Sequence, residues 1–106
     1  MGYNYCMEKN IPHCNLKVVK GLIAAGNVRT TISAVEGAQD LGIFGKAAMC
    51  EVVNALIRKD FYKSMTTHAD HRVWQDVYRP RLANGAVAYI KLTVVDDLLI
   101  VSFKEK

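Results

Sequence analysis

The sequence predicts an α+β domain in which an antiparallel sheet of about four main strands carries three helices on one face. Apolar residues recur at helical spacing in three stretches of the first half of the chain. The second half alternates or is rich in β-branched and aromatic residues, and short turn signals divide it. Consecutive strands joined by short turns pair antiparallel, and the preceding helices then cover one side of the sheet.

The chain has the size of one domain. It contains 106 residues, of which 51% are hydrophobic and 23% are charged, so it can bury a core of its own. We expect residues 1–10 to form an N-terminal tail and residues 11–106 to form a single domain. The three cysteines lack a paired spacing, which favours reduced thiols in a cytoplasmic protein, and no apolar run is long enough to span a membrane.

Three helices are expected before residue 60. The first ends at Gly26, because glycine readily adopts the left-handed conformation of a helix cap. Either Thr30 or Thr31 can cap the second helix, which Gly42 ends. The third spans roughly Lys46–Arg58 and carries one apolar stripe, as a helix lying on a sheet does. Their apolar faces are Leu16, Val19, Leu22 and Ile23; Ile32, Val35, Ala38 and Leu41; and Met49, Val52, Val53, Leu56 and Ile57.

Residues 60–82 predict a hairpin. Two strand-like segments flank the polar centre Thr67–Asp70, and Pro80 ends the second because proline cannot donate to a sheet ladder. Alternation leaves the buried side of the first strand open, and the same holds for Gln75; a β-bulge would settle both. Phe61, Lys63 and Met65 would share one side, and Tyr62, Ser64 and Thr66 the other.

Two more strands are expected after the hairpin. Asn84–Gly85 is a strong turn signal, and Asp96–Asp97 is the next tight turn. Between them residues 86–95 alternate, which places Tyr89, Lys91 and Thr93 opposite the apolar side. The last strand is expected to bury Leu99, Val101 and Phe103, to expose Ser102 and Lys104, and to bring Val101 against Leu56.

Aromatic and cationic residues concentrate in the predicted hairpin, and two interpretations stay open. The rings fill the core while the arginines keep the surface soluble, or an open sheet face holds single-stranded RNA by stacking and phosphate pairing. The net charge of +4 adds a small preference for a polyanionic partner. The candidate RNA-binding residues are Tyr62, Trp74, Tyr78, Arg79 and Arg81.

Cofactor and metal motifs are lacking in the sequence. There is no Walker loop, no GxGxxG and no GxSxG, so no cofactor is expected. His68 and His71, with Asp70 between them, could belong to a metal site or an acid–base pair. A solvated turn is the favoured interpretation, because no cysteine or further histidine is near in the sequence, and we expect no metal site.

Three segments resemble the MqsR family of toxin mRNA interferases: DFYKSMTT at 60–67, WQDVYRPRL at 74–82 and LIVSFKEK at 99–106. VRTT at 28–31 also fits, and the resemblance runs from about Met7 to Lys106. It implies a RelE-like fold and sequence-dependent cleavage of single-stranded mRNA, with a family preference for sites beginning GC, which inhibits translation and growth. It also implies neutralisation by a cognate MqsA-like antitoxin with a DNA-binding region. The alternative is a non-catalytic RNA-binding or antitoxin-binding module that uses the same face.

The resemblance assigns the active site to Lys63, Gln75, Tyr89 and Lys104. RNA can be cut without metal if its own 2′-hydroxyl attacks the adjacent phosphate. Our hypothesis places Tyr89 and Lys63 in proton transfer, Lys104 in stabilising the phosphorane charge, and Gln75 in orienting the phosphate or a base. The segment before Tyr89 is one residue longer than the family pattern, and HADH at 68–71 begins with His68 where the family often has tyrosine.

A free sheet edge is the expected docking place for the antitoxin. Four strands in meander order leave the outer strands with unpaired backbone groups, which a partner strand can join. Residues 60–66 are the favoured edge, because the last strand is needed to present Lys104 to substrate. The opposing expectation is that the Val28–Arg29 segment or the N-terminal tail covers that edge.

Overall fold

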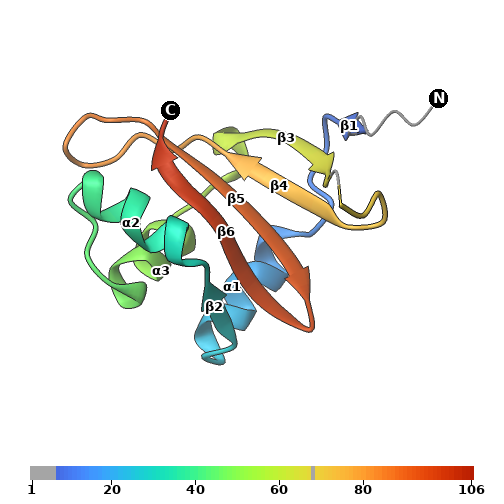
Figure 1. Ribbon diagram of the computed structural model, residues 1–106, viewed down its shortest axis with the longest axis horizontal. Coiled ribbons are helices and arrows are strands. Elements are labelled where there is room, and N and C mark those ends of the chain that lie inside the picture. The colour runs from blue at the N-terminus through green and yellow to red at the C-terminus, as the bar shows by residue number, and fades with distance from the viewer. Residues whose placement is uncertain (1–6, 68) are drawn as a thin grey trace.

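The computed structural model describes residues 7–67 and 69–106, and Figure 1 shows its arrangement of helices and strands. Over these residues it forms three α-helices, one short 3-10 helix and six strands. The helices are α1 (Leu16–Ala24), α2 (Ile32–Asp40) and α3 (Lys46–Asn54), and the 3-10 helix η1 spans Arg58–Asp60. The strands are β1 (Glu8–Lys9), β2 (Val28–Thr30), β3 (Phe61–Thr66), β4 (Trp74–Tyr78), β5 (Ala88–Val95) and β6 (Asp97–Glu105).

The predicted α+β class is confirmed, but the sheet is larger than predicted. Within the described part of the chain its strand order is β1-β3-β4-β5-β6-β2. The expected meander is β3 to β6, which pair antiparallel. Two short strands extend it, and β2 runs parallel to β6, so the sheet is mixed rather than antiparallel. A RelE-like arrangement stays a prediction.

Short segments cover both edges that the sequence suggested were free. Glu8 and Lys9, expected in a tail, pair with Met65 and Ser64 of β3. The backbone N–H of Thr66 adds a hydrogen bond of 2.9 Å to the carbonyl of Met7. β3 is therefore not a free edge from Ser64 to Thr66, and the prediction of a free edge is wrong for that stretch. The opposing expectation, that the N-terminal tail covers this edge, is confirmed there, and docking of an antitoxin strand stays a prediction.

Caps define the first two helices. The side chain of Asn15 accepts a hydrogen bond from the N–H of Lys17 at the start of α1, and Gly26 follows its end with a φ of 77°. Thr31, one of the two expected caps, accepts a hydrogen bond from the N–H of Ala34 at the start of α2.

Among the described residues, no helix has both the length and the apolar character that a membrane span requires.

Two of the predicted apolar positions lie outside the core. Ile32 is 79% exposed at the first turn of α2, where Ala34 takes the buried position. α3 ends at Asn54 rather than near Arg58, and the chain is extended at Ile57, which is 54% exposed. Leu56 is fully buried, as predicted.

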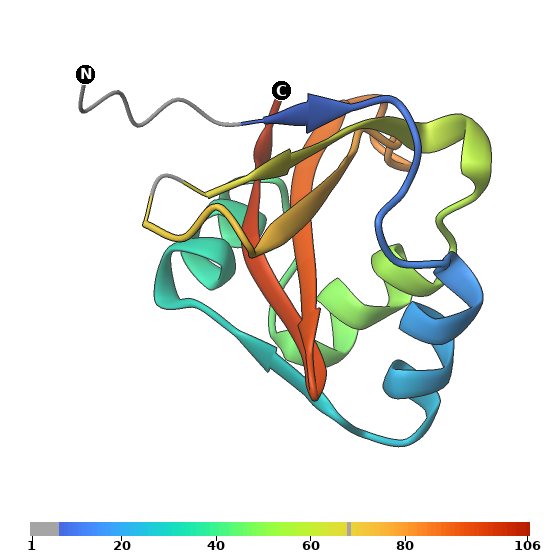
Figure 2. The ribbon, with the colours of Figure 1, turned by 90° about the vertical axis from the view of Figure 1, so that its right-hand side faces the viewer.

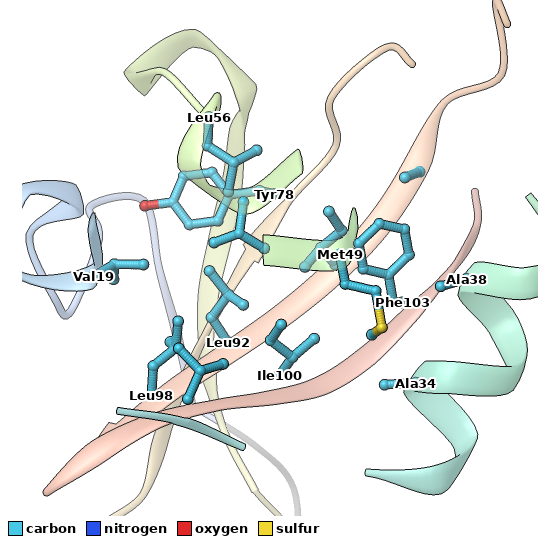
Figure 3. Packing of buried hydrophobic residues seen from close by; sticks show 14 of the residues in the cluster. Val19, Ala34, Ala38, Met49, Leu56, Tyr78, Leu92, Leu98, Ile100 and Phe103 are labelled. Atoms are coloured by element: carbon cyan, nitrogen blue, oxygen red, sulfur yellow. The ribbon is translucent and has the colours of Figure 1, made fainter. Parts of the chain in front are cut away.

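In the core, buried residues of all three helices pack against the same side of the sheet (Figure 3). Figure 2 shows the helices gathered below and beside the strands. β2 pairs with β6 as far as Thr30, and the residue that caps α2 then contacts the next part of β6. The Thr31 hydroxyl donates a hydrogen bond of 2.8 Å to the carbonyl of Val101. The cluster includes Val19, Ala34, Ala38, Met49, Val53, Leu56, Tyr78, Ile90, Leu92, Leu98, Ile100 and Phe103.

A β-bulge in β6 overturns the predicted burial of the last strand. Lys91 pairs with Ser102 whereas Leu92 pairs with Ile100, so Val101 is the extra residue. The bulge lets Ile100 and Phe103 both face the core although they are three residues apart. Val101 is only half-buried and does not pack in the core cluster against Leu56, contrary to the prediction; nor does Leu99 take a core position.

Candidate active site

The four candidate catalytic residues come from four neighbouring strands and lie on the sheet face opposite the core. Lys63 is on β3, Gln75 on β4, Tyr89 on β5 and Lys104 on β6. On β5 the side chains of Ala88, Ile90 and Leu92 are buried in the core, so Tyr89 and Lys91 point the other way. Tyr89 pairs directly with Lys104, which puts both side chains on the same face.

A second bulge settles the orientation of β3. The register shifts between Phe61 and Lys63: Phe61 pairs with Tyr78, whereas Lys63 pairs with Val77. Phe61 therefore packs against the core, edge-on to the ring of Tyr78 at 5.5 Å. Tyr62 and Lys63 are both free to reach the opposite face, which simple alternation would not allow.

Tyr62 and Tyr89 form the centre of the site. Their ring centroids are 6.5 Å apart in an edge-to-face arrangement. Within the described residues, four cations lie against these two rings. The distances to the Tyr62 centroid are 3.7 Å from Arg79 Cζ and 5.4 Å from Lys63 Nζ, and those to the Tyr89 centroid are 5.7 Å from Lys104 Nζ and 6.0 Å from Lys91 Nζ. We call these six residues the tyrosine–cation cluster.

Strand pairing explains how the cluster is supported. Val77 pairs with Lys63 on one side and with Lys91 on the other, so the three residues form a row across the open face. Val77 is fully buried although it lies outside the core cluster. The aliphatic stems of long lysine side chains can cover apolar surface while their charged ends stay in water. We infer that the aliphatic stems of Lys63 and Lys91 cover the side chain of Val77.

Lys63 carries an ion pair that the sequence did not suggest. Its Nζ donates a hydrogen bond of 2.7 Å to Oε2 of Glu8, from β1. This hydrogen bond raises the pKa of Lys63 above its usual value, although partial burial acts in the opposite direction. Lys63 is therefore held in its charged form. Residues 1–10 lack periodicity, so no pattern indicated that Glu8 would reach the site. Lys91 could have been found, because it alternates with Tyr89.

Gln75 lies on the same face but at a distance along the sheet. It pairs with Met65, one row from Lys63 and two rows from the pair of Tyr89 and Lys104. Two residues along a strand span roughly 7 Å, so Gln75 is set apart from Tyr89 by about two such steps. Its side chain is half-buried and its position suits contact with a neighbouring nucleotide.

The candidate RNA-binding residues divide into separate places. Tyr62 and Arg79 belong to the cluster, whereas Arg81 is exposed in the β4–β5 connection and donates to the carbonyl of Gly85 at 3.1 Å. Tyr78 is a core residue with 0% exposure, and burial raises the pKa of its hydroxyl. The prediction that Tyr78 stacks on RNA is wrong for this reason.

Trp74 also lies away from the cluster. It pairs with the fully buried Thr66. Its ring stacks on His13 at 5.5 Å, and Nζ of Lys9 lies 4.1 Å from its centroid. Trp74 and His13 line a pocket with Asp76, whose carboxylate accepts hydrogen bonds from the N–H groups of His13 and Cys14. Trp74 therefore contributes to the attachment of the N-terminal segment.

The predicted turn between β3 and β4 holds charged side chains close to each other. Asp70 accepts hydrogen bonds from the guanidinium and from the backbone N–H of Arg72; the guanidinium lowers the pKa of Asp70 most, and the backbone N–H lowers it further. His71 is exposed, and His68 lies outside the described residues. In the part of the chain that the structure describes, no three histidine, cysteine or acidic side chains come together as metal ligands.

The sequence matches a known family over nearly its whole length. The family described as motility quorum-sensing regulator, toxin of MqsA, matches residues 11–105. A protein of Escherichia coli (strain K12) named mRNA interferase toxin MqsR is 58% identical over 100 residues, which cover 94% of this chain and all of that protein. Lys63, Gln75, Tyr89 and Lys104 all lie inside the family match. The chain therefore belongs to the MqsR toxin family.

Proposed function

We propose that this protein is an mRNA interferase, the toxin of a type II toxin–antitoxin system, and that the tyrosine–cation cluster is its active site. The observation that carries the proposal is the placement of Lys63 and Lys104 on one open sheet face, against the rings of Tyr62 and Tyr89. Cations paired with exposed aromatic rings are the groups that bind single-stranded nucleic acid, through phosphate contacts and base stacking. The E. coli relative named as an mRNA interferase toxin supports the assignment.

The proposed substrate is single-stranded mRNA, cut within sequences that begin GC. The 42% exposed ring of Tyr62 offers a stacking face, and Arg79 lies against the same ring. Base stacking on an aromatic side chain contributes about 1 to 3 kcal/mol per base. Arg81, which is exposed in the β4–β5 connection, would offer a further cation to the RNA backbone, and Gln75 would orient a nucleotide next to the scissile phosphate.

Cleavage would proceed by attack of the RNA 2′-hydroxyl on the adjacent phosphorus, without a metal ion. A bond forms from the 2′-oxygen to phosphorus, the bond from phosphorus to the 5′-oxygen breaks, and the products are a 2′,3′-cyclic phosphate and a 5′-hydroxyl. A base must accept the 2′-proton and an acid must supply one to the 5′-oxygen. A positioned proton-transfer group contributes roughly 10² to 10⁴ in rate.

The geometry supports a division of roles that differs in one respect from the one suggested by the sequence. Tyr89 is the candidate for proton transfer, because its hydroxyl-bearing ring lies against two lysines, Lys91 and Lys104. Lys63 suits charge stabilisation better than proton transfer, since Glu8 raises its pKa. Lys63 and Lys104 would then both stabilise the charge on the phosphorane.

The proposed partner is a cognate MqsA-like antitoxin with a DNA-binding region, and the proposed location of both is the cytoplasm. The family description names MqsA as the antitoxin of its members. A ribonuclease that acts on cellular mRNA needs such restraint. Because Met7 and β1 cover β3 from Ser64 to Thr66 and β2 pairs with β6 from Leu98 to Ile100, an antitoxin strand would pair with β1 or β2, displace one of them, or join β3 outside the covered stretch.

Cleavage of a defined mRNA by the purified protein in excess chelator tests the function. We expect cutting to continue in chelator and to leave 2′,3′-cyclic phosphate and 5′-hydroxyl ends. Loss of cutting that a divalent ion restores would refute the metal-independent reaction. Binding of RNA without any cutting would favour the non-catalytic alternative.

A further inference from the structure

Glu8 brings a negative charge to a site built from cations. Its Oε2 lies 2.7 Å from Lys63 Nζ. Glu8 pairs with Met65 in the β1–β3 ladder, so its side chain lies on the same face as Lys63. The side chain of Lys63 is 22% exposed and that of Glu8 is 52% exposed, so the lysine is the more sheltered partner of the pair.

Backbone contacts hold Glu8 in place independently of its ion pair. The N–H of Met7 donates to the hydroxyl of Thr66, and the N–H of Thr66 donates to the carbonyl of Met7, each at 2.9 Å. Thr66 is fully buried. Because these hydrogen bonds do not involve the carboxylate, removing the charge of Glu8 should leave β1 in position.

The groups that face Lys63 explain why a carboxylate matters there. They are Glu8 from β1, Tyr62 from its own strand and Tyr89 from β5, while β4 contributes the uncharged Val77. Three further cations surround the same two rings: Arg79, Lys91 and Lys104. Like charges favour the neutral form of a lysine and an opposite charge favours the ammonium form, and within the described residues Glu8 is the acidic side chain in hydrogen-bond contact with the cluster.

We propose that Glu8 is a positioning residue that holds Lys63 charged and fixed beside the two tyrosine rings for RNA cleavage. The inference rests on the proposed function and adds a residue that precedes the family match at 11–105. A lysine side chain is long and flexible, so a hydrogen bond to a fixed strand lowers the number of positions that its ammonium group occupies. The scissile phosphate then meets a cation that is already in place.

The test compares Glu8→Gln with Glu36→Gln. Glutamine keeps the size of Glu8 but has no charge, so it loses the ion pair and with it the strong ammonium–carboxylate hydrogen bond that holds Lys63. Glu36 is exposed on α2 and gives the same change in net charge away from the ion pair. In Glu8→Gln we expect kcat to fall by about 10-fold or more while the KM for RNA does not rise, because a positioned group acts on turnover and the added positive charge favours binding. Glu36→Gln should keep the wild-type kcat.

The pH dependence gives a second readout with a defined sign. Glu8 raises the pKa of Lys63, so removing its charge lowers that pKa. Activity that needs charged Lys63 falls as pH rises through the pKa, and the alkaline limb of the kcat profile should therefore shift to lower pH in Glu8→Gln. Titration of the Lys63 ammonium by NMR should show the same shift in protein without RNA.

The outcomes separate this inference from the proposed function. An unchanged Lys63 pKa and alkaline limb in Glu8→Gln, as in Glu36→Gln, would overturn the role of Glu8 even if Lys63→Ala abolishes cleavage. Full cleavage by Lys63→Ala would instead show that the active site itself has been placed wrongly.

Discussion

At the scale of single residues, the two tyrosines of β4 and β5 show how one strand position decides between chemistry and packing. Tyr78 and Ile90 pair on the core side, whereas Tyr89, next to Ile90, faces the open side. The family resemblance assigned Tyr89 to the active site, and Tyr78 was a candidate for RNA binding, so both were expected on the open face. Only the register of the sheet separates them, and register depends on pairing across strands that local sequence does not encode.

Exchanging each of these tyrosines for phenylalanine tests that separation. Tyr89→Phe keeps the ring and its contacts with Lys91 and Lys104 but removes the hydroxyl. We expect cleavage to fall by about 10² or more, with RNA binding retained, because the lost group transfers a proton. Tyr78→Phe is the matched control and should cleave at the wild-type rate.

The stability of the control is informative as well. The Tyr78 hydroxyl is buried and has no hydrogen-bond partner among the described residues, so its removal should leave the melting temperature unchanged or raise it. A Tyr89→Phe protein with wild-type single-turnover rates would remove Tyr89 from the mechanism. A markedly lower melting temperature of Tyr78→Phe would contradict the conclusion that the Tyr78 hydroxyl makes no hydrogen bond within the described residues.

At the scale of elements, bulges and short strands account for most of what the sequence did not predict. The helices could be anticipated from periodicity, and Thr31 and Gly26 from cap chemistry. Simple alternation assigned Val101 to the core, but the bulge moved it out and put Ile100 inward. β1 and β2 are two and three residues long, so their pairing depends on tertiary contact rather than on any pattern within them.

α2 and β6 meet at Gly37, which has consequences for Lys104. A Cβ built on Gly37 would collide with the carbonyl oxygen of Phe103, next to Lys104. Gly37→Ala should therefore destabilise the protein, although alanine in a helix interior normally stabilises by about 1 kcal/mol relative to glycine. It should also lower cleavage, because a displaced β6 carries Lys104 out of position.

Gly21→Ala in α1 is the control for this contact. A Cβ at Gly21 meets nothing within 4 Å, so the substitution should raise the free energy of unfolding by up to about 1 kcal/mol and leave cleavage unchanged. Denaturant unfolding of both variants provides the comparison. If Gly37→Ala were as stable as Gly21→Ala, the close packing of α2 on β6 would be wrong.

At the scale of the whole molecule, the sheet separates stability from chemistry. One side packs against buried residues of the helices, and the other carries the tyrosine–cation cluster. Family segments in the sequence named Lys63, Gln75, Tyr89 and Lys104 as candidates, and strand order and register bring them to one face. The ion pair of Lys63 with Glu8 could not be predicted from the sequence, because it joins residues 55 positions apart and depends on the pairing of a strand of two residues.

The most direct test of the central claim is the single-turnover cleavage rate of the double variant Lys63→Ala/Lys104→Ala on a defined mRNA, measured beside the wild type. Both side chains lie on the face away from the core, so the melting temperature should stay near that of the wild type. We predict that cleavage falls by at least about 10², since the variant lacks both charges proposed to stabilise the phosphorane. Near-wild-type cleavage by the folded double variant would contradict the claim that the tyrosine–cation cluster cuts RNA.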